Sequence, residues 1–280
     1  MSAQQKPFVT EEFARHIDSG HKMDTSETYN QVLALRDEIW QYISTELNFS
    51  EDLGCQDIHN FNDLQGNHLG RMRNFTGDND NPVDWVIHSD IGQPQNTFTN
   101  IHLTFWMKGN TDVPHLGMAF GTLPEAFYYV DMMPRYELVT HPEHVEKYYD
   151  AINDVAMAHQ NELFEHGVKP FNAAMPFIRA SLSPCAVAGV GPLSFFENNA
   201  KQKIWAVVKH WLELVKNAQQ DDDQMQCQKR RQRDYDQRRS IVYLDPANPI
   251  AERLVGKQAA DRLIRILAGE ERNGKPYNRD

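Results

Sequence analysis

One predicted strand of this 280-residue chain places a proton-carrying side chain among polar and aromatic neighbours. Residues 100–106 are rich in apolar and aromatic side chains, and successive side chains of a strand point to opposite faces. His102, Thr104 and Trp106 therefore share one face, and the alternate residues on the other face are all apolar. Because imidazole exchanges protons near neutral pH, this mixed face suits a pocket with His102 as acid–base catalyst. A hydrogen-bonded structural histidine is the competing interpretation.

Two charged side chains outside this strand are further candidates. Asp131 ends an otherwise apolar predicted strand, and Arg135 follows four residues later. A buried carboxylate needs a partner, so an Asp131–Arg135 ion pair and a role of Asp131 in a site carry equal weight. Arg179 has no Asp or Glu near it in residues 166–196. It therefore either holds a carboxylate or phenolate of a ligand or forms a salt bridge to a remote acid.

Four stretches between Val83 and Ala218 occur in a recognisable order. They read DVPH in a strand, DMMPRYEL in a turn, HPEHVEKYYD at a helix start and FIRASLSP before a later helix. As a set they resemble the red chlorophyll catabolite reductase family and its ferredoxin-dependent bilin reductase relatives. The resemblance implies a pocket between a sheet and the helices that follow it, no tightly bound metal or flavin, and a conjugated substrate. It also implies electrons from ferredoxin and protons from the protein.

One position departs from the resembled pattern. Those reductases carry a proton-donating Asp or Glu five residues after the strand proline, and this chain has Ala119 there. His102 stands at a similar separation to their catalytic histidine, so the resemblance implies that it is the retained half of the pair. Because a methyl group donates no proton, the resemblance predicts an inherited fold with altered chemistry.

Three functions follow from this reading. The main hypothesis is a cofactor-free lyase that binds a planar conjugated aromatic molecule and cleaves it through proton removal by His102, for example releasing a small fragment from a phenolic, lignin-type dimer. The alternative is a ferredoxin-dependent reductase of a linear tetrapyrrole, of the red chlorophyll catabolite or bilin type. The third is a non-catalytic protein that binds a pigment or aromatic compound.

Other side chains near the strand of His102 complete the expected site. His88 ends the preceding strand with Asp90 just beyond it, and Tyr129 is an aromatic residue of the kind that stacks on a flat ligand. Packing at a strand end is the simpler interpretation of His115. The residues expected in catalysis are His102, Asp131 and Asp90, and those expected to bind substrate are Arg179, Trp106, Thr104, His88, His115, Met118, Ala119 and Tyr129.

The elements that must position these residues are a sheet and several helices. Apolar residues recur every three or four positions in four segments, which predicts amphipathic helices at residues 27–47, 143–166, 198–218 and 249–268. Strands separated by short connections are predicted at residues 83–88, 100–106, 115–120 and 126–132. Residues 50–81 are rich in Asn, Asp and Gly and predict a long irregular connection.

This order of elements predicts an α+β fold. We expect one domain over residues 1–280, an α/β/α sandwich with a central antiparallel sheet and helices on both faces. Its core would span residues 27–218, followed by a charged segment at 219–240 and a C-terminal helix at 249–269. The charged segment is most simply a solvent-exposed helix, and docking of a partner protein or a second subunit is the rival interpretation.

Charge and cysteine content limit the partners. The formal net charge of −11 disfavours nucleic acid and anionic membranes, and so favours a small-molecule substrate. Cys55, Cys185 and Cys227 are odd in number and far apart, which predicts neither a disulfide framework nor a cysteine-based metal site. No bound cofactor is therefore expected, and ferredoxin would supply electrons for a reduction.

No stretch predicts a membrane span or signal peptide, so a cytoplasmic protein is expected.

One weak metal motif is present. His141 and His144 lie three residues apart with Glu143 between them. Pro142 is expected to place His141 at the entrance of a helix rather than on its face, so no metal site is predicted.

Overall fold

The protein is described by a computed structural model that covers residues 23–96, 98–122, 125–170, 176–245, 247–272 and 275–276. The main strands are β1 (Phe49–Glu51), β2 (Phe61–Asn62), β3 (His68–Gly77), β4 (Val83–Gln93), β5 (Phe98–Met107), β6 (His115–Thr122), β7 (Ala126–Met133), β8 (Lys169–Pro170) and β9 (Val187–Gly191). The helices are α2 (Ser26–Glu46), α3 (Pro142–Tyr148), α4 (Asp150–Glu165), α5 (Pro176–Ala180), α6 (Leu193–Phe195), α7 (Lys201–Lys216), α8 (Gln224–Tyr243), α9 (Asn248–Val255) and α10 (Lys257–Leu267). Shorter elements are η1 (Leu53–Ile58), η2 (Pro94–Asn96), the π-helical turn η3 (Phe196–Ala200) and the hairpin β10 (Glu271–Arg272) with β11 (Lys275–Pro276).

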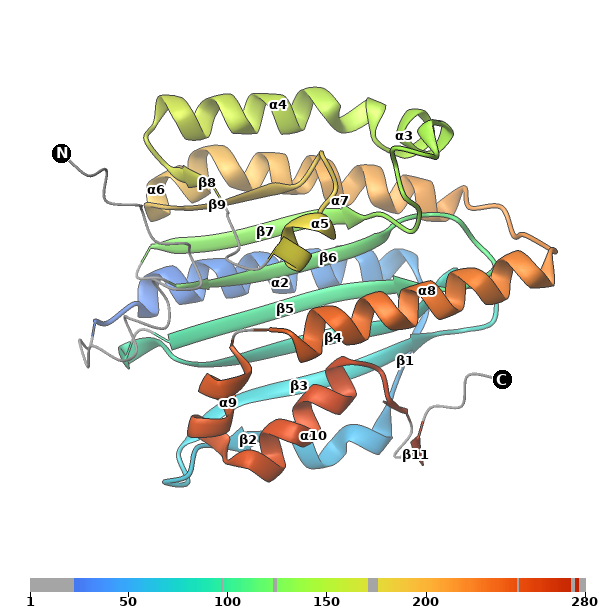
Figure 1. The fold of residues 1–280 in the computed structure, drawn as a ribbon. Coiled ribbons are helices and arrows are strands. Elements are labelled where there is room, and N and C mark those ends of the chain that lie inside the picture. Colours follow the sequence, from blue (N-terminus) through green and yellow to red (C-terminus); the bar gives the residue numbers. More distant parts are fainter. Residues whose placement is uncertain are drawn as a thin grey trace.

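Nine of the eleven described strands form one sheet in which all neighbours are antiparallel. Its order is β1-β3-β4-β5-β6-β7-β9-β8, and β2 pairs with β3 beside β1. Helices cover both faces, with α2, α4 and α7 behind the sheet and α8, α9 and α10 in front (Figure 1). The predicted α+β class and the sandwich of helices around an antiparallel sheet are confirmed.

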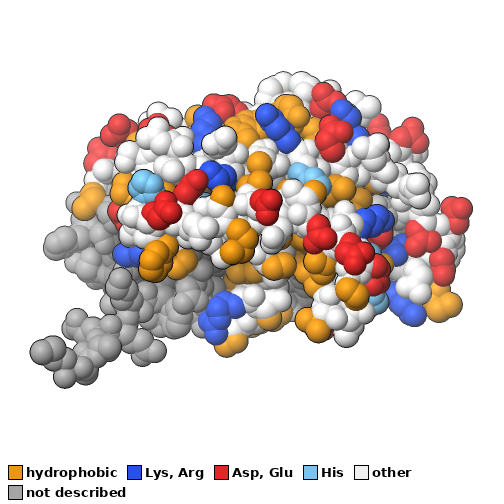
Figure 2. Space-filling view, turned by 90° about the horizontal axis from the view of Figure 1, so that it is seen from above, with side chains coloured by type: hydrophobic (Ala, Val, Ile, Leu, Met, Phe, Trp, Pro, Cys, Tyr) orange, Lys and Arg blue, Asp and Glu red, His pale blue; other side chains and the backbone are white. Residues whose placement is uncertain are grey.

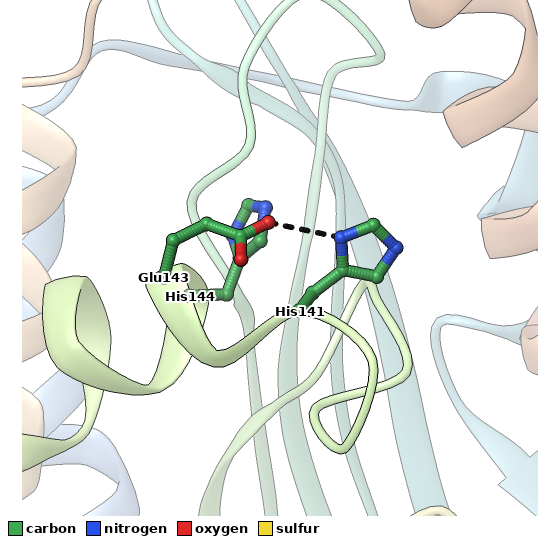
Figure 3. Close-up of side chains that lie close together, drawn as sticks. All are labelled: His141, Glu143 and His144. Atoms are coloured by element: carbon green, nitrogen blue, oxygen red, sulfur yellow. Dashed lines mark hydrogen bonds and ion pairs between the residues drawn. The ribbon is translucent and has the colours of Figure 1, made fainter.

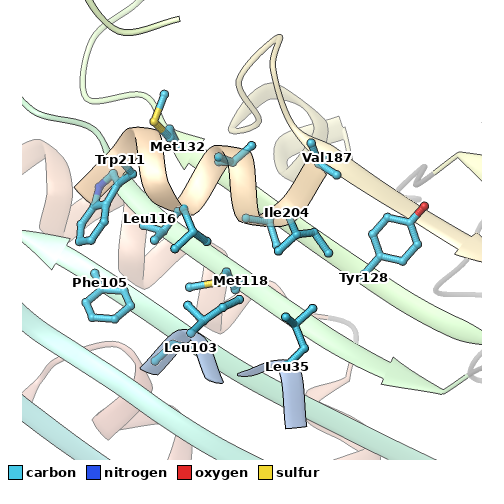
Figure 4. Close-up of a cluster of buried hydrophobic side chains, with 14 of the residues drawn as sticks. Leu35, Leu103, Phe105, Leu116, Met118, Tyr128, Met132, Val187, Ile204 and Trp211 are labelled. Atoms are coloured by element: carbon cyan, nitrogen blue, oxygen red, sulfur yellow. The ribbon is translucent and has the colours of Figure 1, made fainter. Parts of the chain in front are cut away.

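One face of the sheet, called the core face, is apolar. Leu103 and Phe105 of β5 and Leu116 of β6 point toward α2 and α7 and are fully buried (Figure 4). Leu35 of α2 and Trp211 of α7 pack into the same cluster. Burying each such side chain stabilises the fold by roughly 1.5–3 kcal/mol, so this cluster is what holds the sheet between its helices. The apolar face predicted for β5 is confirmed as core.

The opposite face, called the site face, carries His102 and is covered differently. Helix α10 packs on its β3–β5 side, where Trp85, Trp106 and Met72 belong to one buried cluster with Leu263 and Ile266. The short helix α5 lies on the same side of the sheet, over β6 and β7 (Figure 1). The described helices therefore leave the middle of this face less covered than its β3–β5 side.

The long irregular connection predicted for residues 50–81 is wrong. It contains β1, η1, β2 and the ten-residue strand β3. The polar side chains of β3 make ion pairs with neighbouring strands, Arg71 with Asp90 at 2.9 Å and Arg73 with Glu51 at 2.7 Å. The polar side chains of β3 find their partners on other strands. The local sequence therefore lacks the clear alternation of apolar and polar residues that predicts a strand.

Two predicted helices are each divided into two shorter helices. The C-terminal helix divides into α9 and α10 at Gly256, whose φ of +80° lies in the region that favours glycine. The helix predicted at 143–166 divides into α3 and α4 at Tyr149, whose hydroxyl donates to the Met132 carbonyl at 2.9 Å. Apolar periodicity continued across both breaks and concealed them.

The charged segment forms helix α8, and the expectation that it is solvent-exposed holds for its outer face only. Its inward stripe is largely polar and buried: Cys227, Arg230, Asp234, Tyr235 and Arg238. Arg230 donates to the Gly109 carbonyl at 2.8 Å and Arg238 to the Ala268 carbonyl at 2.8 Å. Such paired charges are buried without large desolvation loss, which is why a polar sequence packs against the molecule. None of the described helices is long and apolar enough to cross a lipid bilayer.

Candidate functional site

A row of four partly exposed residues crosses the middle of the site face. His102 of β5 is opposite Ala119 of β6, Ala119 is opposite Tyr129 of β7, and Tyr129 is opposite Ala188 of β9. Each of the four is partly exposed, whereas the residues directly before and after each of them are buried. We call these four residues the open row, because they are accessible from the site face alone.

The floor around the open row is flat because β6 presents only small residues to it. Gly117, Ala119 and Gly121 alternate on this face. A Cβ added at Gly117 would lie 2.9 Å from Met133 Sδ, and one added at Gly121 would lie 2.6 Å from the Thr99 carbonyl oxygen. The glycines are therefore covered, whereas Ala119, between an imidazole and a phenol, is partly exposed. A flat floor of this kind suits a planar ligand.

The imidazole of His102 is neutral at pH 7. Burial lowers its pKa to about 4, and the positive charge of Arg36 acts in the same direction. A neutral imidazole has one nitrogen that donates and one that accepts a hydrogen bond, so His102 is able to pass a proton between a ligand and solvent. Thr104, the next residue of β5 on this face, is also partly exposed and lies beside Gly117.

At its other end the site face is closed by α8. Trp106 and His115 are buried there, with ring centroids 4.6 Å apart, and Arg238 of α8 lies 5.4 Å from the Trp106 ring. The structure thus places Trp106 and His115, two of the eight residues expected to bind substrate, beneath a helix and not in the open row.

His115 belongs to a buried network with Asp234 and Arg135. Its Nδ1 accepts from the Met107 backbone N–H at 2.9 Å, and its Nε2 lies 3.0 Å from Asp234 Oδ1. Arg135 Nη2 lies 2.5 Å from Asp234 Oδ2. The predicted Asp131–Arg135 ion pair is wrong, because Arg135 pairs with Asp234. Burial alone raises the pKa of Asp234, but Arg135 and His115 outweigh it and hold that pKa well below its usual range.

The His115 imidazole makes stability depend on pH. Burial lowers its pKa to about 4 in the folded chain, against an ordinary 6.5. The unfolded chain binds this proton and the folded chain does not, so the free energy of unfolding falls as pH is lowered through this window, by up to about 1.4 kcal/mol per pH unit. We expect His115→Gln to reduce the change of the unfolding free energy with pH by the contribution of one proton. The measurement is urea unfolding at several pH values. His68→Gln, an exposed control, leaves the slope unchanged. Equal slopes for His115→Gln and the unaltered chain would contradict this assignment.

Asp131 holds Tyr129 and the turn before β9 in place. Its carboxylate accepts from the Ser183 backbone N–H at 2.8 Å, from the Ser183 hydroxyl and from the Tyr129 hydroxyl at 3.2 Å. It is fully buried, and burial raises its pKa although these hydrogen bonds oppose the shift. Asp131 therefore reaches the open row only through Tyr129.

Three expected site residues lie on the core face instead. Asp90 accepts from Arg36 and from Arg71, each at 2.9 Å. His88 Nε2 lies 3.6 Å from Asp37 Oδ1, and Met118 is buried in the apolar cluster. The structure does not bring these residues together with His102, because strand alternation sends them to the face that α2 covers.

Arg179 was singled out as a cation buried in an apolar phrase. The structure places it on α5, where it is exposed to solvent. The expectation that Arg179 is buried is therefore wrong, and its proposed roles, holding a ligand carboxylate or phenolate or forming a salt bridge to a remote acid, stay predictions.

One acidic residue of the site face was missed from the sequence. Asp245 lies in the connection between α8 and α9, and burial raises the pKa of its carboxyl group. Its Oδ1 accepts from the Ala247 backbone N–H at 2.7 Å. Ile241 of α8 and Leu254 of α9 pack on the cluster that includes Ile87 and Trp106, so this connection lies over the site face. The Asp-Pro pair at 245–246 reads simply as a turn, which concealed it.

Comparison with known proteins identifies the family. The family model of red chlorophyll catabolite reductase (RCC reductase) matches residues 30–269. The chain belongs to the red chlorophyll catabolite reductase family. It is 23% identical to the chloroplastic red chlorophyll catabolite reductase 1 of Oryza sativa subsp. japonica over 214 residues, which cover 71% of this chain and 64% of the rice protein. It is 27% identical to the enzyme of Hordeum vulgare over 143 residues, covering 47% of this chain and 68% of the barley protein. The match thus spans less than two thirds of the rice relative.

The fold is also found in a solved structure. The crystal structure of phytochromobilin synthase from tomato in complex with biliverdin has a TM-score of 0.72 and 14% sequence identity, covering 88% of this chain and 83% of that one. The resemblance stated from the motifs is confirmed. The lyase hypothesis, with its phenolic substrate, is wrong, because the chain belongs to a family of reductases. A cytoplasmic location stays a prediction.

Proposed function

We propose that this chain reduces a linear tetrapyrrole with electrons from reduced ferredoxin, and that the substrate lies over the open row. The observation that carries the proposal is the flat strip of the site face from His102 across Ala119 to Tyr129 and Ala188. A linear tetrapyrrole is a conjugated molecule whose pyrrole rings lie flat on such a floor. Family membership and the biliverdin complex of the tomato relative support the same substrate class.

The chemistry divides between donor and protein. Reducing one double bond takes two electrons and two protons, and two molecules of reduced ferredoxin supply the electrons one at a time. No tightly bound cofactor is part of the proposal. His102 passes one proton to the substrate, because negative charge added to the tetrapyrrole favours the protonated imidazole beside it.

The second proton needs a source other than residue 119. Ala119 has no acidic hydrogen, and the Tyr129 hydroxyl is a poor acid because burial raises its pKa well above its ordinary value. We assign the role to Asp245, because burial raises the pKa of its carboxyl group and so favours the protonated form that donates. The connection that carries Asp245 lies over the site face, because Ile241 of α8 and Leu254 of α9 pack on the cluster there.

Ferredoxin would meet the chain on the outer face of α8. Lys229, Arg231, Arg233 and Arg239 are exposed there, in a chain whose net charge is −11. Ferredoxins are usually acidic, so this concentration of positive charge is complementary to them. The face over α4 offers no such patch, because acidic side chains are scattered there among basic and apolar ones (Figure 2).

The Ala119→Glu variant tests this proposal. Restoring a carboxylic acid over the open row adds a proton donor, which is worth about 10²- to 10⁴-fold in rate. We expect the unaltered chain to reduce biliverdin or red chlorophyll catabolite slowly under anaerobic conditions with reduced ferredoxin, and Ala119→Glu to do so faster by that factor. The rate is followed by loss of the visible absorbance of the conjugated substrate. Ala119→Gln is the matched control, because glutamine has the same size as glutamate and no acidic proton.

The outcomes of this assay separate the functions. Absence of ferredoxin-dependent turnover in both the unaltered chain and Ala119→Glu, with both folded, would overturn the reductase proposal. The replacement of the carboxylate by Ala119 favours one other function, a protein that binds the pigment without reducing it. Tight binding by the unaltered chain with no turnover, together with turnover by Ala119→Glu, would support that second function.

A further inference from the structure

A cluster of three potential metal ligands lies at the start of α3, apart from the open row. One ligand atom from each of His141, Glu143 and His144 lies within 4.8 Å of the other two. The three side chains converge above the first turn of the helix (Figure 3), with His141 Nδ1 2.9 Å from Glu143 Oε1. We propose that these residues bind a divalent transition-metal ion of the zinc class.

The backbone explains why the cluster forms in spite of Pro142. Pro142 is the first helical residue, and His141 before it has φ −128° and ψ 64°, outside the helical region. The backbone N–H of His144 donates to the His141 carbonyl at 3.0 Å and closes the turn. The side chain of His141 thereby returns over the helix start toward Glu143. The expected position of His141 at the helix entrance is confirmed, and from there its side chain still lies beside Glu143.

The His144 ring is held in position by aromatic neighbours. It stacks on Tyr136 with ring centroids 3.9 Å apart and an interplanar angle of 18°, and its centroid lies 5.7 Å from that of Tyr148. The Tyr136 hydroxyl in turn accepts from Arg230 Nη1 at 2.9 Å. A ligand that is already ordered loses little conformational entropy when it binds a metal. The site is therefore partly preorganised.

The ligand set selects the kind of ion. Two imidazoles and one carboxylate suit Zn²⁺ and its neighbours Co²⁺, Ni²⁺ and Cu²⁺, whereas Mg²⁺ and Ca²⁺ require mainly oxygen ligands. With zinc–ligand distances of about 2.0–2.2 Å, the ligand atoms of a tetrahedral site lie roughly 3.3–3.5 Å apart, so only small side-chain rotations are needed. The side chains of His141 and Glu143 are 43% and 63% exposed, which leaves a path for the ion and a position for water.

Zinc titration of the purified full chain, without an affinity tag and freed of metal by a chelator, tests the proposal. Isothermal titration with ZnCl₂ is expected to show one saturable equivalent, and His141→Ala and Glu143→Gln are each expected to weaken it by at least about tenfold. His166→Ala, an exposed histidine after α4, is the matched control and leaves the affinity unchanged. Titration with Co²⁺ is expected to give visible absorption bands that disappear in His144→Gln, with circular dichroism confirming that each variant is folded.

Two results would overturn the proposal. One is the absence of saturable zinc binding by the unaltered chain. The other is the same zinc affinity in the unaltered chain and in the double variant His141→Ala/His144→Gln. Neither measurement uses a tetrapyrrole or ferredoxin, so the metal site stands or falls independently of the reductase function.

Discussion

Replacing His102 by glutamine is expected to lower the rate of tetrapyrrole reduction by about 10²- to 10⁴-fold, because the variant loses the imidazole that passes a proton to the substrate. Glutamine keeps a hydrogen-bonding side chain of similar reach at the same place in the open row, so substrate affinity changes less than the rate. The measurement is the single-turnover rate with reduced ferredoxin under anaerobic conditions. His166→Gln, the same substitution at an exposed position, retains the original rate.

The pH dependence distinguishes proton transfer from a positional role of His102. Because burial lowers the pKa of His102 to about 4, its protonated fraction in the free protein rises as pH is lowered toward that value. We expect kcat/KM to increase between about pH 8 and about pH 5, and the increase to be absent in His102→Gln. A glutamine variant that keeps both the original rate and the original pH profile would remove His102 from the mechanism.

Replacing Asp234 by asparagine is expected to lower the free energy of unfolding by about 3–5 kcal/mol, because it leaves the buried Arg135 guanidinium without its counter-charge. Asp234 Oδ2 lies 2.5 Å from Arg135 Nη2, and Asp234 Oδ1 lies 3.0 Å from His115 Nε2. Both partners belong to the main body of the molecule, so the loss also weakens the attachment of α8. The measurement is urea unfolding at neutral pH.

Asp236 supplies the control for this measurement. It lies two residues further along α8 and is exposed, so Asp236→Asn is expected to change stability by no more than about 0.5 kcal/mol. If Asp234→Asn and Asp236→Asn unfolded at the same urea concentration, the buried network would not hold α8 to the sheet.

The parts of the fold that local patterns determine could be predicted. Helix α2 and strands β4 to β7 were predicted because an apolar stripe or alternation marks each of them in the sequence. Strand β3 was missed because its polar residues are satisfied across strands, as Arg71 is by Asp90. Helix α8 was expected to be exposed because its buried charges have partners that composition does not reveal. Asp234, for example, lies 99 positions from Arg135.

The candidate site was predicted in part, and for a similar reason. Strand alternation correctly grouped His102 with Thr104, since both depend only on positions within β5. Alternation does not determine which face of the sheet a residue of another strand occupies, so Asp90 and Met118 were expected beside His102 and lie behind it. Asp245 comes to the site face through the packing of α8 and α9, which no local pattern encodes.

Ligand binding to an Ala119→Trp variant tests most directly whether the substrate lies over the open row. Biliverdin is titrated into the unaltered chain and the variant, and its visible absorbance reports binding. An indole at position 119 fills the space between His102 and Tyr129, so we expect it to weaken binding by at least about tenfold, a loss of about 1.4 kcal/mol. Met157→Trp, which places the same side chain on the exposed face of α4, is expected to bind as the unaltered chain does. Equal affinities of Ala119→Trp and the unaltered chain would contradict the proposed site.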